Sequence, residues 1–293
     1  MVAPIVIGAQ PKRDDLAPIE LGVMLSRLTG APIHVVGTYW FDSTPRRTAS
    51  EEYGEALRQD VGRAVAQVLG GEELEAPVEV HVKAGSPAHA LQESAAELGA
   101  GVIVVGSTRR GTFGRIATGT TVDRVLDGAP CPVIIAPSGF RRAWGPTPTV
   151  GVAFVDTPGG WSALAAGAAM ARGTGASLVA YTVTDADTDA GDRARAQTAV
   201  ERALAERAHD LDCEARVLTG GAAALAVESR NLDFLIRGCR SAGRLRTPLA
   251  REVPSRLASA VECPFMVVAP GRERPLASLF AGDGAGREAQ MLA

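Results

Sequence analysis

The chain has 293 residues, of which 46% are hydrophobic and 22% are charged, so it can bury the cores of two ordinary globular domains. Its formal net charge of −3 gives no electrostatic reason to expect nucleic acid or an anionic membrane as a partner. The N-terminus lacks a secretory signal pattern, and no apolar run approaches the roughly 20 residues that span a bilayer, so we expect a cytoplasmic protein.

The first half of the chain alternates short apolar runs with amphipathic stretches, which is the pattern of strands and helices in a parallel sheet. Strands are predicted at residues 4–8, 33–36, 78–82, 102–105 and 133–136. Helices are predicted at residues 17–28, 51–69, 87–98 and 121–126. Ser86 is expected to cap the third of these helices, with Pro87 as its first residue.

A segment rich in Gly, Pro and Arg at residues 138–148 is interpreted as an interdomain linker, and after it the same pattern restarts. Strands are predicted at residues 150–155, 177–183, 213–218, 233–236 and 265–269, and helices at residues 162–172, 193–209, 222–229 and 254–261. Gly106 matches Gly238, and APCP at 129–132 matches VECP at 261–264. The chain is therefore predicted to be an internal repeat.

Strands that alternate with helices predict a doubly wound parallel sheet with right-handed crossovers. The expected fold class is α/β, with two tandem five-stranded domains at residues 1–140 and 148–270 and a flexible tail at residues 271–293. The fifth strand of each domain is an open sheet edge. We therefore expect the runs at 133–136 and 265–269 to meet at the interface between the domains.

A loop rich in glycine and hydroxyl groups follows the fourth predicted strand, between Gly106 and the helix predicted from Thr121. In parallel α/β sheets ligands bind beyond the carboxyl ends of the strands, where this loop is expected to lie. Backbone N–H groups at glycines and at a helix N-terminus attract anions. The loop is therefore a candidate phosphate-binding site.

Two tandem units, each ending in a glycine loop, a helix, a Cys-Pro pair and an apolar strand, resemble the universal stress protein family in its tandem two-domain form. The resemblance covers residues 2–138 and 148–270. It implies a Rossmann-like fold of the adenine nucleotide alpha hydrolase type and a stress-response regulatory role rather than an enzymatic one. Nucleotide-binding members of the family carry G-x2-G-x9-G-[ST] after the fourth strand and an acidic residue at the end of the first.

The family motif matches the first half of this sequence in part. Gly106 takes the first glycine position, and Gly119 and Thr120 take the last two positions. Ser107 and Thr121 add hydroxyl groups beside them. The resemblance therefore implies that the first domain binds an adenine nucleotide, ATP with Mg²⁺, through these residues.

Two positions of the first half depart from the motif. Arg109 stands at the second glycine position, and Gln10 stands where the acidic residue is expected. The Arg109 side chain either fills the space that glycine leaves for phosphate, or pairs with a phosphate through its guanidinium group. The first half is thus a nucleotide site or, in the alternative, a cationic loop without a ligand.

The second half departs further from the motif. Ser241 replaces the second glycine, and Arg251 and Glu252 replace the final Gly-[ST] pair. Glu252 places a negative charge where a phosphate would lie, and the acidic residue Asp156 falls one position late. We therefore expect a degenerate second domain that binds no nucleotide.

The remaining reactive side chains predict no further site. The cysteines show no C-x-x-C spacing and are expected to be reduced thiols; they are Cys131, Cys213, Cys239 and Cys263. His34 and His81 fall in predicted strands, and neither has a second ligand at metal-binding spacing. We accordingly expect no resident metal at the histidines and no catalytic residue.

Two classes of function remain. One is a regulatory protein whose partner is an adenine nucleotide in the first domain. The other is a stress-associated scaffold that binds no nucleotide and acts through contacts with a protein partner that the sequence does not identify. In both cases the two halves are expected to form an intramolecular pseudo-dimer, which leaves room for a homodimer as well.

Overall fold

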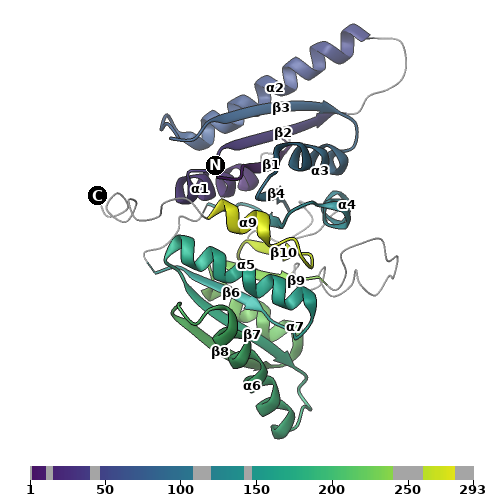
Figure 1. The fold of residues 1–293 in the computed structure, drawn as a ribbon. Coiled ribbons are helices and arrows are strands. Elements are labelled where there is room, and N and C mark those ends of the chain that lie inside the picture. Colours follow the sequence, from purple (N-terminus) through teal and green to yellow (C-terminus); the bar gives the residue numbers. More distant parts are fainter. Residues whose placement is uncertain are drawn as a thin grey trace.

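The computed structural model describes residues 2–10, 16–39, 47–107, 120–141, 147–239 and 260–280, without the side chains of residues 47–51 and 120. The ten strands in these ranges form one continuous sheet with helices on both faces (Figure 1). The α/β fold class with a mostly parallel central sheet is confirmed.

The elements of the first half follow the predicted order, with shifted ends. They are β1 (Ile5–Ala9), α1 (Ala17–Thr29), β2 (Ile33–Tyr39), α2 (Arg47–Leu69), β3 (Val78–Ala84), α3 (Pro87–Leu98), β4 (Val102–Gly106), α4 (Thr120–Gly128) and β5 (Val133–Ala136). Helices α1 and α3 end at Gly30 and Gly99, whose φ angles of 68° and 63° favour glycine. Ser86 occupies the N-cap position of α3 as predicted, but its side chain makes no capping hydrogen bond.

The second half repeats this order. Its elements are β6 (Thr149–Ala153), α5 (Pro158–Thr174), β7 (Ser177–Thr184), α6 (Ala190–Arg207), β8 (Cys213–Thr219), α7 (Gly221–Glu228), the 3₁₀ helix η2 (Ser229–Asn231), β9 (Phe234–Gly238), β10 (Phe265–Val268) and α9 (Arg274–Leu279). Helix α5 begins before the predicted Ser162, because the Thr157 hydroxyl accepts a hydrogen bond from the Gly160 N–H and Pro158 fits the first turn. The helix predicted at residues 254–261 lies largely outside the described residues.

The strand order is β3-β2-β1-β4-β5-β10-β9-β6-β7-β8. Within each domain the neighbouring strands are parallel, and apolar residues alternate between two buried faces. Ile5 and Ile7 belong to the core that includes residues of α1 and α2, whereas Val6 belongs to the core that includes residues of α3 and α4. Coverage on both faces explains why the strands read as unbroken apolar runs.

The two domains meet where β5 and β10 pair antiparallel, with Phe265 opposite Ile135 and Met266 opposite Ile134. All four side chains are fully buried. The expectation that the two fifth strands lie at the interdomain interface is therefore confirmed.

Helix α9 differs from the expected flexible tail. Its Leu276 and Leu279 are fully buried, and it packs against α5 of the second domain and β4 of the first (Figure 1). A Cβ at Gly101, just before β4, would lie 3.0 Å from the Cβ of Leu279. Burial of these leucines fixes residues 274–279 across the junction, while residues 281–293 lie outside the described part of the chain.

Strand register relates the two domains residue by residue. The equivalent rows of paired residues are Ile5–Ile33–Val78 in the first domain and Val150–Leu178–Cys213 in the second. Val102 pairs with Ile5, and Phe234 pairs with Val150, so the same register makes Gly106 the counterpart of Gly238. This correspondence supports the predicted internal repeat.

Candidate functional site

After β1 and β4 the chain of the first domain runs in opposite directions across the sheet. Strand β1 continues through α1 to β2 on one side, whereas β4 continues through α4 to β5 on the other. Ile7 pairs with Val104 in parallel, so the carboxyl ends of β1 and β4 lie side by side. Open α/β sheets bind ligands at such a switch point.

The structure describes five of the seven predicted site residues. Gly106 is the last residue of β4, and the buried Ser107 follows it, with its N–H donating to the Ala136 carbonyl over 3.1 Å. Gln10 is exposed directly after β1, and Thr120 and the half-buried Thr121 begin α4. Arg109 and Gly119 lie outside the described residues, so how the loop joins these groups stays a prediction.

Gly106 meets only side-chain atoms among the described residues. A Cβ at this position would lie 3.4 Å from Cγ and 3.5 Å from Cδ of Pro18, in the first turn of α1. These are ordinary packing distances. The end of β4 is therefore not closed by the backbone at the start of α1.

The equivalent place in the second domain is closed. A Cβ at Gly238 would overlap the backbone oxygen and carbon of Gly159, and a Cβ at Gly159 would overlap the carbonyl oxygen of Cys239. The first turn of α5 thus packs directly against the end of β9. Ser241, Arg251 and Glu252 lie outside the described residues, so the degenerate nucleotide loop of the second domain stays a prediction.

Asp156, the displaced acidic residue of the second domain, has partners of its own. It accepts a hydrogen bond from the Trp161 indole N–H over 2.8 Å and lies 3.3 Å from Arg202. Trp161 belongs to α5 and Arg202 to α6. Asp156 therefore joins the two helices at their exposed surfaces.

The cysteines are free thiols, as predicted. Cys131 and Cys263 are buried in the core that includes residues of α3 and α4. Burial raises the pKa of Cys131 to about 12, which keeps the thiol protonated and unreactive.

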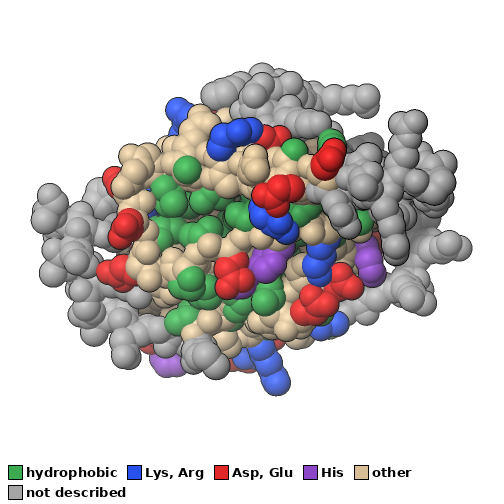
Figure 2. All heavy atoms as spheres, turned by 90° about the horizontal axis from the view of Figure 1, so that it is seen from above, with side chains coloured by type: hydrophobic (Ala, Val, Ile, Leu, Met, Phe, Trp, Pro, Cys, Tyr) green, Lys and Arg blue, Asp and Glu red, His purple; other side chains and the backbone are tan. Residues whose placement is uncertain are grey.

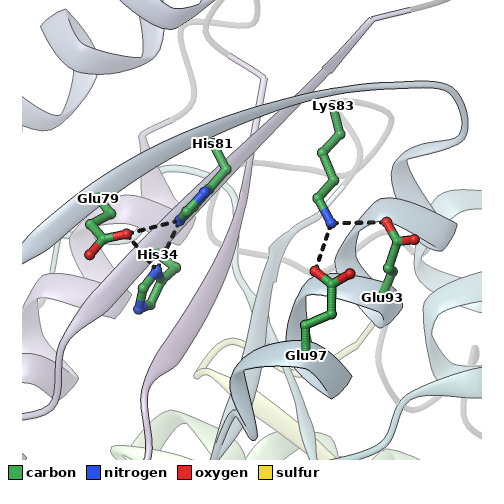
Figure 3. A network of polar contacts seen from close by, with 6 residues as sticks. All are labelled: His34, Glu79, His81, Lys83, Glu93 and Glu97. Atoms are coloured by element: carbon green, nitrogen blue, oxygen red, sulfur yellow. Dashed lines mark hydrogen bonds and ion pairs between the residues drawn. The ribbon is translucent and has the colours of Figure 1, made fainter.

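The prediction that His34 and His81 have no second ligand nearby is wrong. His34 on β2 and His81 on β3 were expected to stand alone, but their Nδ1 and Nε2 atoms lie 2.9 Å apart, and Glu79 lies beside both (Figure 3). Spacing along the chain missed this cluster because the pairing of β2 with β3 joins residues that are distant in sequence. The signal present was Glu-x-His in a strand, which puts both side chains on one face.

Burial lowers the pKa of His34, and the neighbouring His81 adds to this effect while Glu79 opposes it. The neutral imidazole is thus favoured at His34. In a neutral imidazole one ring nitrogen carries no proton, and this nitrogen can accept a hydrogen bond or bind a metal.

None of the described helices is both long enough and apolar enough to cross a bilayer.

Comparison with known families gives a match for the first half of the chain. Residues 1–137 match the family model described as "Universal stress protein family". No curated protein matches the chain.

Solved structures extend the likeness in fold to both halves. A universal stress protein from Archaeoglobus fulgidus DSM 4304 is 16% identical, with 93% of this chain and 98% of that chain covered and a TM-score of 0.68. A putative universal stress protein from Pseudomonas aeruginosa UCBPP-PA14 is 15% identical, with 95% and 96% covered and a TM-score of 0.61. A shorter protein, the universal stress protein from Archaeoglobus fulgidus in complex with dAMP, is 24% identical and covers 46% of this chain and 99% of its own, with a TM-score of 0.35.

Proposed function

We propose that this protein, in which residues 1–137 form a universal stress protein domain, binds an adenine nucleotide at the carboxyl edge of β1 and β4 and serves as a regulatory module in the stress response. The nucleotide is ATP with Mg²⁺, and the protein acts by binding rather than by turnover. Its free, partly buried cysteines suit the reducing cytoplasm.

The observation that carries the proposal is the position of Gly106 at the switch point of the first domain. The residue ends β4 without a side chain, and the α1 backbone does not close over it. A phosphate group needs such close approach to backbone N–H groups. The start of α4 at Thr120 adds the positive end of a helix dipole to the same loop.

The second domain acts as the structural partner of the first. Its equivalent strand end is covered by Gly159 of α5, and its chain is joined to the first domain through the sheet. We therefore assign one nucleotide to each chain. The two domains form the intramolecular pseudo-dimer.

A scaffold without nucleotide is the alternative function. It is favoured by Gln10, which offers an exposed amide where family members that bind nucleotide carry a carboxylate. Arg109 at a glycine position favours it as well, if its side chain occupies the phosphate space.

The test is calorimetric titration of the full chain with ATP and Mg²⁺, beside the variant Arg109→Gly. Wild type is expected to give a saturable heat with one nucleotide per chain. If Arg109 pairs with a phosphate, the variant binds about tenfold more weakly or worse, because a charge-assisted hydrogen bond is worth about 1.5–3 kcal/mol. Tighter binding by the variant would instead show that Arg109 obstructs the site.

The matched control is Ser241→Gly, at the corresponding position of the second domain, and it is expected to leave the titration unchanged. Absence of heat from both wild type and Arg109→Gly would contradict nucleotide binding and favour the scaffold.

A further inference from the structure

A cluster of two histidines and one glutamate lies on neighbouring strands at the first-domain end of the sheet. In the parallel pairing of β2 with β3, His34 stands opposite Glu79 and Val36 stands opposite His81. Alternate residues of a strand point to the same face, so the three side chains share one face. It is the face of α3, because Val36 belongs to the same core as Leu91 of that helix.

Three potential ligand atoms converge in this cluster (Figure 3). Nδ1 of His34 and Nε2 of His81 lie 2.9 Å apart, and Oε2 of Glu79 lies 3.5 Å from each of them. A triangle with these sides has a centre about 1.9 Å from all three corners, close to the 2.0–2.2 Å at which zinc binds imidazole nitrogen and carboxylate oxygen.

Hydrogen bonding explains only one side of this triangle. The two ring nitrogens lie within hydrogen-bond distance if one donates and the other accepts. The carboxylate oxygen at 3.5 Å is too far from either nitrogen for a normal hydrogen bond. Two ligand atoms of one tetrahedral zinc ion lie about 3.3 Å apart. The carboxylate oxygen of Glu79 is therefore at a suitable distance from both nitrogens to bind the same ion.

The surroundings favour a cation and give it access. The side chain of His34 is 10% exposed, that of His81 33% and that of Glu79 59%. The cluster is therefore buried at His34 and open to solvent at Glu79. Figure 2 looks onto this end of the molecule and shows histidine side chains at the surface among charged ones.

The nearby Lys83 does not compete for the site. Its ammonium group lies 2.9 Å from Glu93 and 3.2 Å from Glu97, both on α3 (Figure 3). The pair of carboxylates outweighs its single positive charge. Lys83, Glu93 and Glu97 together therefore carry a net negative charge, which attracts a divalent cation.

From this geometry we infer that His34, Glu79 and His81 form a binding site for a first-row divalent cation, best matched by Zn²⁺, with water completing the coordination. Two imidazoles and one carboxylate with an open position make a donor set that zinc accepts. The ion would tie the edge strand β3 to β2. Since His34 and Glu79 are the second residues of their strands, the site lies toward the amino ends, away from the end of β4.

The second domain provides an internal contrast. Register places Val179, Glu214 and Arg216 at the positions of His34, Glu79 and His81. There Arg216 donates two hydrogen bonds of 2.7 Å to Glu214, from Nε and from Nη2. The glutamate is shared by both domains, but in the second domain an arginine satisfies it, so these three positions of the second domain do not make a zinc donor set.

The test is titration of the EDTA-treated full chain with ZnCl₂ in competition with a chromogenic chelator. One Zn²⁺ per chain is expected, and Zn²⁺ should raise the thermal midpoint, because a ligand that binds the folded state stabilises it. Glu79→Gln and His81→Asn are each expected to weaken binding about tenfold or more, which corresponds to about 1.4 kcal/mol. In wild type, Zn²⁺ should shift the imidazole NMR signals of two of the 4 histidines.

Glu214→Gln is the matched control and should leave zinc binding unchanged. Circular dichroism of the metal-free variants should equal that of wild type, since Glu79 and His81 are partly exposed. The inference is overturned if wild type binds no Zn²⁺, if both variants bind it as well as wild type, or if Cys213→Ser or Cys239→Ser abolishes binding.

Discussion

The two domains share one strand register but use the end of the central strands differently. In the first domain, a Cβ at Gly106 would meet the Pro18 side chain at 3.4 Å, whereas a Cβ at Gly238 would overlap the backbone of Gly159. The glycine therefore has a different role in each domain. In the second domain it admits a helix start, and in the first it leaves a strand end that we assign to phosphate.

The outer strands differ in the same way. Glu79 and Glu214 occupy equivalent positions, and each faces a basic or imidazole side chain two residues further along its strand. Arg216 holds Glu214 at 2.7 Å, but the nitrogen of His81 lies 3.5 Å from Glu79. Position alone thus does not define the chemistry, because the partner decides whether a carboxylate is satisfied.

The largest expected effect compares Gly238→Ala with Gly106→Ala. The added methyl group at 238 requires the backbone of Gly159 to move, and we expect a loss of about 3 kcal/mol or more. The methyl group at 106 meets a side chain at packing distance, so a loss below about 1 kcal/mol is expected. Thermal midpoints measure the difference, at about 2–4 °C for each kcal/mol.

Equal midpoints for the two alanine variants would contradict the closure of the second domain. ATP titration of Gly106→Ala adds an independent readout. If the strand end binds phosphate, this variant loses affinity while it keeps its fold.

The next largest effect is expected when zinc ligands are introduced at the equivalent positions of the second domain. In the double variant Val179→His/Arg216→His, Glu214 is freed from its arginine and two imidazoles are supplied at the equivalent positions. The number of Zn²⁺ ions bound per chain is expected to rise from one to two. The single variant Arg216→His lacks one imidazole and should bind the second ion about tenfold more weakly, as chelator competition would show.

The smallest effect concerns two equivalent arginines, each three residues before the glycine that ends its helix. Arg172 contacts Asp210 through Nε and Nη2, both at 2.6 Å, whereas Arg27 contacts Glu72 once, at 2.5 Å. The hydrogen bonds from Arg172 lower the pKa of Asp210 to about 2. Arg172→Ala should return that pKa toward its ordinary value of 3.8, as an NMR titration of the carboxyl carbon would show.

This pKa shift has a definite sign for stability. A carboxyl group whose pKa is lower in the folded state stabilises the fold above the unfolded pKa, and this contribution is lost as the pH falls toward about 2. Arg172→Ala should therefore narrow the stability difference between neutral and acidic pH.

Most of the fold could be predicted from the sequence because its signals are local. Apolar runs locate the strands, and the repeated Cys-Pro landmark aligns the two halves. The predicted pairing of the two fifth strands also holds, since an uncovered apolar edge needs a partner. Helix α9 was missed because Leu276 and Leu279 form too short a pattern to indicate burial.

The candidate sites were less accessible to sequence reasoning. Gly106 could be placed because it follows an apolar run directly. The His34–Glu79–His81 cluster could not, because it depends on the register between two strands, and a shift of one residue would send a side chain to the other face. The closure of the second domain likewise depends on how α5 meets β9, which the matching of Gly106 with Gly238 does not reveal.

The antiparallel contact between β5 and β10 gives the molecule an approximate two-fold axis inside one chain. In a symmetric homodimer each substitution is made twice, so a change that suits one copy must also suit the other. Covalent fusion removes that constraint. Helix α9 contacts both domains, through α5 and β4, and no counterpart occurs among the described residues between β5 and β6. Because the chain is asymmetric, one copy could close its strand end while the other kept it free for a ligand.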